Sequence, residues 1–217
     1  MRRAVPLILP ALVAVGACAP ATRPVVPVAP SVPVGEVIEE WRGYAAPEDA
    51  ERIGTLAQAW EEGLETARNA GFVSAIEGQG LLLEPDAGLP RPDPTPGSYE
   101  CRLVKLGAAK RGDPAFIAYQ DFFCYVQIEE DRFTIVKQTG SQRPAGRLYD
   151  ADDRYIFLGS LALGNEREPM AYGEDPERDM AGVWERIGPF RWRLAIPYPR
   201  SGGILDVFEL VPTAEQP

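Results

Sequence analysis

Eight short segments of alternating apolar and polar residues fill the second half of this chain and limit the folds it can adopt. They lie at about 99–106, 121–129, 131–138, 145–149, 154–162, 180–187, 190–197 and 204–211, separated by turns rich in Gly, Pro and Asp. The clearest is 190–196, where four apolar residues alternate with Arg191, Arg193 and Ala195. Successive side chains of a strand point to opposite faces, so each segment predicts a β-strand with one apolar face.

The regular spacing of these strands favours an antiparallel meander over residues 97–213. Closure into a barrel removes the exposed edges of such a sheet, so we expect a barrel-like domain, with a β-sandwich as the alternative. The 217 residues of the chain leave room for one such domain and a helical appendage. Residues 214–217 are predicted to form a short tail.

The region 36–96 is predicted to be a helical segment followed by a Pro-rich linker. A helix is expected from Pro47, which suits the first helical position, to Gly71. Its apolar residues recur at steps of three or four and form one face: Ile53, Leu56, Trp60, Leu64 and Ala67. We expect this face to pack on the sheet, which makes the fold class α+β. Residues 72–89 indicate no clear element, and four prolines in 89–97 indicate the linker.

The first residues of the chain look like an export signal. Arg2 and Arg3 precede an apolar run at 4–14 that is too short to span a bilayer, and small residues lead to Cys18. This pattern resembles a bacterial lipobox. The resemblance implies that residues 1–17 are a lipoprotein signal peptide and that Cys18 carries acyl chains such as palmitate, which anchor the protein to a membrane. The alternative is an ordinary signal peptide, cut next to Cys18 or after Ala19.

Two features near the lipobox bear on where the protein lies. Because Ala19 rather than Asp follows the cysteine, the usual sorting rule implies the outer membrane, with the protein facing the periplasm. Residues 18–35 are rich in Pro, and four prolines stand three residues apart at 24, 27, 30 and 33. This spacing predicts a stiff polyproline II tether that holds the domain away from the lipid, or alternatively a ligand for a proline-binding domain.

The two remaining cysteines, Cys101 and Cys124, are an even pair in a chain predicted to be exported. Exported thiols are oxidised, so we expect a disulfide between two strands, with two buried free cysteines as the alternative. The bridge would close a loop of about 24 residues and stabilise the fold by roughly 3 kcal/mol.

The composition excludes several classes of function. A net charge of -10 argues against a nucleic-acid partner, because phosphate binding needs a basic surface. The chain has no histidine, which excludes Ser-His-Asp and Cys-His catalysis and most zinc enzymes. With no phosphate loop or dinucleotide motif either, we expect no cofactor, no metal and no catalytic residue.

Carboxylates remain as candidates for acid-base chemistry on sugars, namely Asp179, Glu185 and Asp206. Each also has a structural interpretation, which we favour. Asp179 and Glu185 are predicted to pair with Arg178 and Arg186. Asp206 alternates with apolar residues and, if buried, needs an arginine or a backbone partner, because an unpaired buried charge is costly.

The segment 137–143 is the polar cluster that best fits a ligand site. It is dense in hydrogen-bond donors, is centred on Gly140 and follows a predicted strand. Lys137, Ser141 and Arg143 are therefore candidate ligand-binding residues. The alternative is a turn whose side chains satisfy the local backbone.

Several motifs together resemble a known bacterial family. They include 97–102, 137–143, Phe157-Leu-Gly159, Tyr172-Gly173, 185–188, 191–194 and 205–212, with Ala59-Trp60 upstream. The chain is identified over about 36–212 as similar to the domain-of-unknown-function family DUF4893. This family has no known activity, so the resemblance assigns no site residue.

These observations predict a non-enzymatic envelope lipoprotein. Its expected work is binding, either of a small ligand inside the barrel or of another envelope protein. The alternative function is a carboxylate-dependent hydrolase that acts on envelope glycan.

Overall fold

The computed structural model describes residues 39–164, 166 and 169–213. The predicted signal peptide at 1–17, Cys18, the Pro-rich tether at 18–35 and the tail at 214–217 lie outside these residues.

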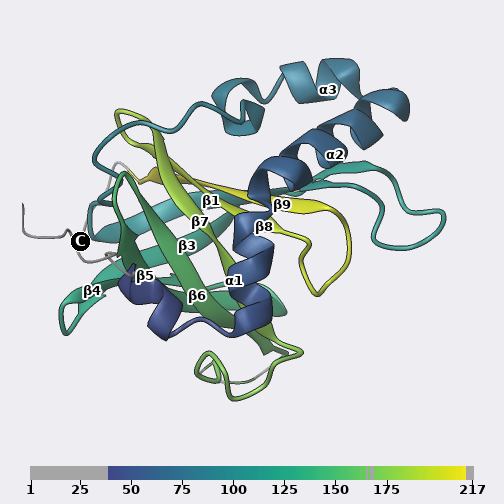
Figure 1. The fold of residues 1–217 in the computed structure, drawn as a ribbon. Coiled ribbons are helices and arrows are strands. Elements are labelled where there is room, and N and C mark those ends of the chain that lie inside the picture. Colours follow the sequence, from purple (N-terminus) through teal and green to yellow (C-terminus); the bar gives the residue numbers. More distant parts are fainter. Residues whose placement is uncertain (1–38, 165, 167–168, 214–217) are drawn as a thin grey trace, which may run out of the picture. The chain divides into compact units, whose positions relative to one another are not determined.

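The described strands form a closed antiparallel barrel, as the alternation predicted (Figure 1). The strands are β1 (Gly97–Leu106), β2 (Phe116–Ala118), β3 (Phe122–Glu129), β4 (Arg132–Lys137), β5 (Gln142–Ala151), β6 (Arg154–Leu163), β7 (Asp179–Gly188), β8 (Arg191–Pro197) and β9 (Leu205–Pro212). From β3 to β9 each strand pairs with the next along the chain, and β1 pairs with β2, β3 and β9. The β1–β9 pairing runs from Tyr99–Pro212 to Leu106–Leu205 and closes an eight-stranded barrel, to which the short β2 is added.

Strand alternation divides the barrel side chains into two sets. The inner set packs large apolar residues together: Tyr99, Leu148, Phe157, Trp184, Trp192, Leu194 and Leu210. On the outer face of β1, β8 and β9, smaller apolar residues such as Val104, Ala195 and Val207 pack against the helices. The barrel therefore has a filled interior and an apolar outer wall on one side.

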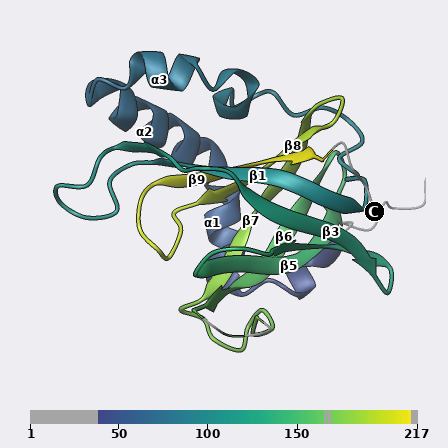
Figure 2. The ribbon, with the colours of Figure 1, turned by 180° about the vertical axis from the view of Figure 1, so that it is seen from behind.

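Short helices cover that outer wall (Figure 2). They are η1 (Glu40–Gly43), α1 (Pro47–Gly54), α2 (Leu56–Asn69), α3 (Val73–Glu77) and η2 (Gly80–Leu83). The single helix predicted from Pro47 to Gly71 is instead two helices that meet at Thr55. The break lets Ile53 pack with β5, β6 and β7 residues while Trp60 and Leu64 pack over β1, β8 and β9. One straight helix would not present its apolar face to both parts of a curved wall.

A buried arginine fastens the helical segment to the barrel. Arg193 points outward from β8, is fully buried, and donates hydrogen bonds to Oε2 of Glu185 (2.8 Å) and to the carbonyl oxygens of Glu84 (2.5 Å) and Pro85 (2.6 Å). Its guanidinium lies 4.8 Å from the centre of the Trp60 ring. We refer to these contacts as the Arg193 clasp.

The Pro-rich segment 89–96 closes one end of the barrel. Both inner tryptophans, Trp184 and Trp192, donate their indole N–H to the carbonyl oxygen of Pro92, at 2.9 and 3.0 Å. The hydroxyl of Tyr99 donates to the carbonyl of Thr95 at 2.5 Å. Composition alone indicated a linker here, whereas the segment packs across the strand ends and satisfies buried aromatic donors.

The predicted disulfide between Cys101 and Cys124 is present. Both residues lie on the inner face, where Tyr99 is opposite Cys124 and Cys101 is opposite Phe122, so the bridge runs diagonally between β1 and β3. The two Cα atoms are 6.0 Å apart, which is a usual separation for a disulfide.

Candidate functional site

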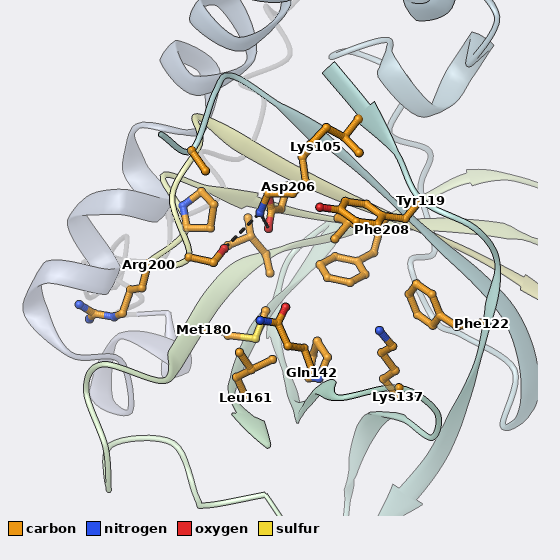
Figure 3. A pocket seen from close by; sticks show the side chains of 18 of the residues that line it. Lys105, Tyr119, Phe122, Lys137, Gln142, Leu161, Met180, Arg200, Asp206 and Phe208 are labelled. Atoms are coloured by element: carbon orange, nitrogen blue, oxygen red, sulfur yellow. Dashed lines mark hydrogen bonds and ion pairs between the residues drawn. The ribbon is translucent and has the colours of Figure 1, made fainter. Parts of the chain in front are cut away.

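The other end of the barrel is open and holds a pocket of about 1030 Å³ (Figure 3). In an antiparallel barrel the end of one strand meets the start of the next at the same rim. The pocket accordingly takes residues from the ends of β1, β4, β6 and β8 and from the starts of β3, β5, β7 and β9. Its size is at the upper end of the range for pockets that enclose a drug-sized molecule.

Apolar side chains form most of the inner-face lining of this pocket. They come from several strands: Leu103, Phe122, Leu161, Met180, Ile196 and Phe208. Figure 3 shows Phe208 and Asp206 on one side of the open space and Gln142, Leu161 and Met180 on the other. Below the pocket lies a gap of about 20 Å³ between Phe122, Phe157 and Phe208, which is no larger than one water molecule. The barrel core is thus filled, and the usable space is at the mouth.

A lysine and a carboxylate are paired on the inner face of the mouth. Nζ of Lys105 lies 2.7 and 2.8 Å from the two carboxylate oxygens of Asp206, and it also donates to Oγ of Ser201 at 3.1 Å. Burial raises the pKa of Asp206 to about 6, against the opposing effect of Lys105. The buried charge of Asp206 is therefore partnered by a lysine, and not by the arginine or backbone group expected from the sequence.

Lys137 is the second inner-face cation, at the end of β4. Its ammonium lies 4.0 Å from the centre of the Phe122 ring. Burial and the nearby Arg143 lower the pKa of Lys137. Within the described part of the chain no carboxylate makes an ion pair with it.

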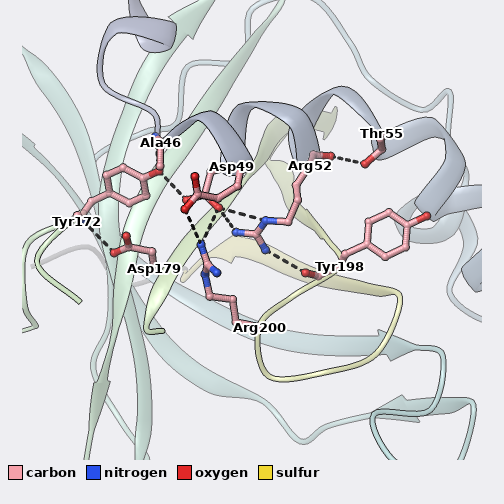
Figure 4. Close-up of polar contacts among 10 residues, drawn as sticks. Ala46, Asp49, Arg52, Thr55, Tyr172, Asp179, Tyr198 and Arg200 are labelled. Carbon is pink, nitrogen blue, oxygen red and sulfur yellow. Dashed lines mark hydrogen bonds and ion pairs between the residues drawn. The ribbon is translucent and has the colours of Figure 1, made fainter. Parts of the chain in front are cut away.

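An ion network beside the mouth holds α1 to two loops of the barrel (Figure 4). Asp49 of α1 is fully buried and accepts hydrogen bonds from Nε of Arg52 (3.1 Å), from Arg200 (3.2 Å) and from the Tyr172 hydroxyl (2.6 Å). Arg52 also donates to the carbonyl of Tyr198 at 2.9 Å. The guanidinium groups of Arg52 and Arg200 line the pocket while remaining bound to Asp49, so they support its outer edge.

The three candidate ligand residues of the sequence have different environments. Lys137 lines the pocket. Arg143 lies at the start of β5, and its guanidinium donates to the carbonyl oxygens of Gly140 (3.0 Å), Gly164 (2.6 Å) and Glu166, so it holds two loops together. Ser141 is exposed, and its carbonyl oxygen accepts a bond from the Gly164 amide (2.9 Å).

The three candidate carboxylates are not brought together. Asp179 and Glu185 are on the outer face of β7, about 20 Å apart along the strand by its rise per residue, whereas Asp206 points inward. Asp179 accepts a bond from the Gly173 amide at 3.0 Å and Glu185 pairs with Arg193 at 2.7 Å. The predicted pairings with Arg178 and Arg186 are wrong: Arg178 binds Glu166 and Asp175, and Arg186 binds carbonyls of the Pro-rich segment.

Most of the pocket was not recognised from the sequence. Lys105 and Met180 were interpreted as ordinary strand residues, and Gln142 lay in the polar segment 137–143 but was not named as a candidate. One signal was present, because Lys105, Lys137, Gln142 and Asp206 are polar residues at inward positions, all near strand ends that share one rim. Among residues 39–213, apart from the undescribed gaps, no group of three or more Cys, Asp or Glu could hold a metal ion. In the same part of the chain no helix has the length and apolarity to cross a membrane.

Fold and site together define a small closed antiparallel barrel with one plugged end, one open end and a pocket in the open end. Eight-stranded barrels of this size have space for side chains or for one small ligand. The family described as Domain of unknown function (DUF4893) matches residues 41–210, and the chain belongs to this family. No curated protein and no solved structure matches the chain.

Proposed function

We propose that the protein is a non-enzymatic binding module that holds a small amphipathic ligand in the open end of its barrel. The observation that supports this most strongly is the pocket of about 1030 Å³, in which an apolar inner lining meets a few charged groups. Ligand sites commonly combine a mostly apolar wall with a small number of polar groups that fix orientation. An envelope protein as partner is the second candidate.

The arrangement of carboxylates weighs against the hydrolase alternative. Glycosidases place two carboxyl groups about 5–10 Å apart on either side of the scissile bond. Of Asp179, Glu185 and Asp206, Asp206 alone lines the pocket, and it is paired with Lys105. The three candidates therefore do not form the pair of carboxylates that sugar hydrolysis needs. The other carboxylates that line the pocket, Asp113, Asp121 and Glu177, are exposed.

The proposal includes the place of the protein in the cell. A lipobox cysteine at Cys18 followed by Ala19 supports an anchor in the outer membrane, facing the periplasm. Labelling of cells with an alkyne analogue of palmitate tests this: the full-length chain should take up the label, and a Cys18→Ser variant should not. Equal labelling of the two chains would contradict the anchor.

Native mass spectrometry tests the binding function. The full-length chain with Cys18→Ser would be purified from the periplasm without detergent and measured before and after mild denaturation. A co-purifying small molecule that is released on unfolding would support ligand binding and give its chemical class. A chain that carries no adduct, even after incubation with a periplasmic lipid extract, would contradict it.

A further inference from the structure

The cations that line the pocket differ in whether they already have a partner. Six basic residues line it, and four of them are held by carboxylates: Arg52 and Arg200 by Asp49, Lys105 by Asp206, and Arg178 by Glu166. In the described part of the chain, Lys110 and Lys137 make no ion pair. Lys110 is exposed on a loop, whereas Lys137 is partly buried on the inner face. Lys137 is therefore the inner-face cation that remains available.

The positive charge on the inner face of the pocket mouth contrasts with the negative net charge of the whole chain. The protein has a net charge of -10, whereas the pocket lining carries six basic and four acidic residues. Three of these acidic residues, Asp113, Asp121 and Glu177, are exposed, and the inner face of the mouth carries two lysines and one aspartate. A partly desolvated charge without a partner is unfavourable. Lys137 has an aromatic ring on one side and the like charge of Arg143 nearby, and neither compensates its charge as a carboxylate would. An anion supplied from outside would do so.

The surroundings of Lys137 also indicate the rest of the ligand. Phe122, Phe208 and Pro144 line the inner end of the pocket together with Lys137, and Leu161 lines the same pocket beside the polar Gln142. A fully polar anion, such as inorganic phosphate, would leave these groups in contact with water or with unsatisfied oxygens. A molecule with an acidic head and an apolar chain would cover them and pair with the lysine at the same time.

We propose that the ligand is a single-chain amphiphile with an anionic head group, carboxylate or phosphate monoester, and that Nζ of Lys137 binds this head while the chain lies against Phe122, Phe208 and Leu161. This inference rests on the proposed function. Lys105 is already held by Asp206 and Ser201, so it helps to shape the mouth and is not the principal anion contact. Binding of the anion should also raise the pKa of Lys137, because an opposite charge favours the ammonium form.

The test compares a charged probe with its neutral counterpart. Dansyl-labelled undecanoate and its methyl ester are titrated into the full-length Cys18→Ser chain and into the same chain with Lys137→Met. Methionine keeps the length and apolar character of the lysine stem without its charge. Lys110→Met is the matched control, since it removes the same charge from the outer rim of the pocket.

We expect Lys137→Met to weaken binding of the carboxylate probe about tenfold to a hundredfold, the range for a hydrogen bond to a charged group. Binding of the ester should change less than about twofold, and Lys110→Met should affect neither probe by more than that. If both probes bind and Lys137→Met leaves them unchanged, the head-group inference is wrong while the proposed pocket function stands. If neither probe binds, the inference is also wrong, and the mass-spectrometric experiment decides the proposed function separately.

Competition identifies which part of the amphiphile is recognised. Displacement of the bound carboxylate probe by dodecanoate and dodecyl phosphate, but weakly by dodecanol, is the expected result, and equal displacement by dodecanol would overturn the inference. Thermal unfolding of Lys137→Met should show no loss of stability, because the variant removes an unpaired charge. Lys137→Gln serves as a second neutral variant if the methionine protein does not fold.

Discussion

Loss of the Arg193 clasp should destabilise the whole domain, because this one side chain fastens the helical segment to the barrel. Arg193→Met would leave Glu185 and the carbonyl oxygens of Glu84 and Pro85 without their donor. Breaking a buried ion pair costs about 3–5 kcal/mol. The Glu185 side chain is 10% exposed and Arg154 lies 3.8 Å from it, so water and Arg154 partly compensate. We therefore expect the lower figure, about 3 kcal/mol.

A loss of this size should lower the melting temperature by about 6–12 °C for a chain of this length. Arg154→Met is the matched control: its side chain is 43% exposed, and such a surface pair contributes less than about 1 kcal/mol. Urea unfolding gives the stability of each variant, and hydrogen exchange of residues 80–85 reports on their attachment. If Arg193→Met is as stable as Arg154→Met and residues 80–85 keep their protection, the clasp does not hold the two parts together.

Three further predictions concern the barrel itself. The pKa of Asp206 rises from 3.8 to about 6 on folding, so between these pH values the folded chain keeps a proton that the unfolded chain loses. The free energy of unfolding should therefore fall by up to about 3 kcal/mol as the pH rises from about 4 to above 6. Urea titrations of the Asp206→Asn variant should lack this pH dependence. Replacing Cys101 and Cys124 by Ser should cost about 3 kcal/mol, since the bridge spans 23 positions, and a loss below about 1 kcal/mol in urea unfolding would contradict this. In the Gly159→Ala variant the new Cβ would overlap the Ala145 carbonyl oxygen and lie 2.6 Å from the Phe157 ring, so the melting temperature should fall markedly. The control variant Gly54→Ala places its Cβ in open space and should not be destabilised.

The strands were the most predictable part of the fold, because alternation is a local signal. The predicted limits lie close to those of the main strands, with the largest difference at β5, which begins at Gln142 and not at 145. The short β2 was missed, since its three residues are stabilised by pairing with the last three residues of β1 and not by a pattern of their own. Barrel closure depends on pairing of β1 with β9, more than a hundred residues away, which alternation favours but does not fix.

The site was predictable to a smaller extent, because a pocket is made of residues that come together only after the sheet curls. Lys137 was found because it stands beside a polar, Gly-containing turn. Arg143 has the same local signal, but its guanidinium turns to carbonyl oxygens of neighbouring loops. The face of the sheet on which each side chain lies decides whether it lines the pocket or contacts a neighbouring loop, and the sequence around the turn does not specify that face.

The Pro-rich segment 89–96, which closes one end of the barrel, has a consequence for how the sequences of this family can vary. The indole N–H groups of Trp184 and Trp192 both donate to the main-chain carbonyl oxygen of Pro92. Every amino acid has such a carbonyl oxygen. Many residue types at position 92 would keep these bonds if the backbone keeps its path. An inserted or deleted residue between Glu84, held by Arg193, and Thr95, held by Tyr99, would move the oxygen away from both tryptophans. Natural variants should therefore conserve the length of this segment more strictly than its composition.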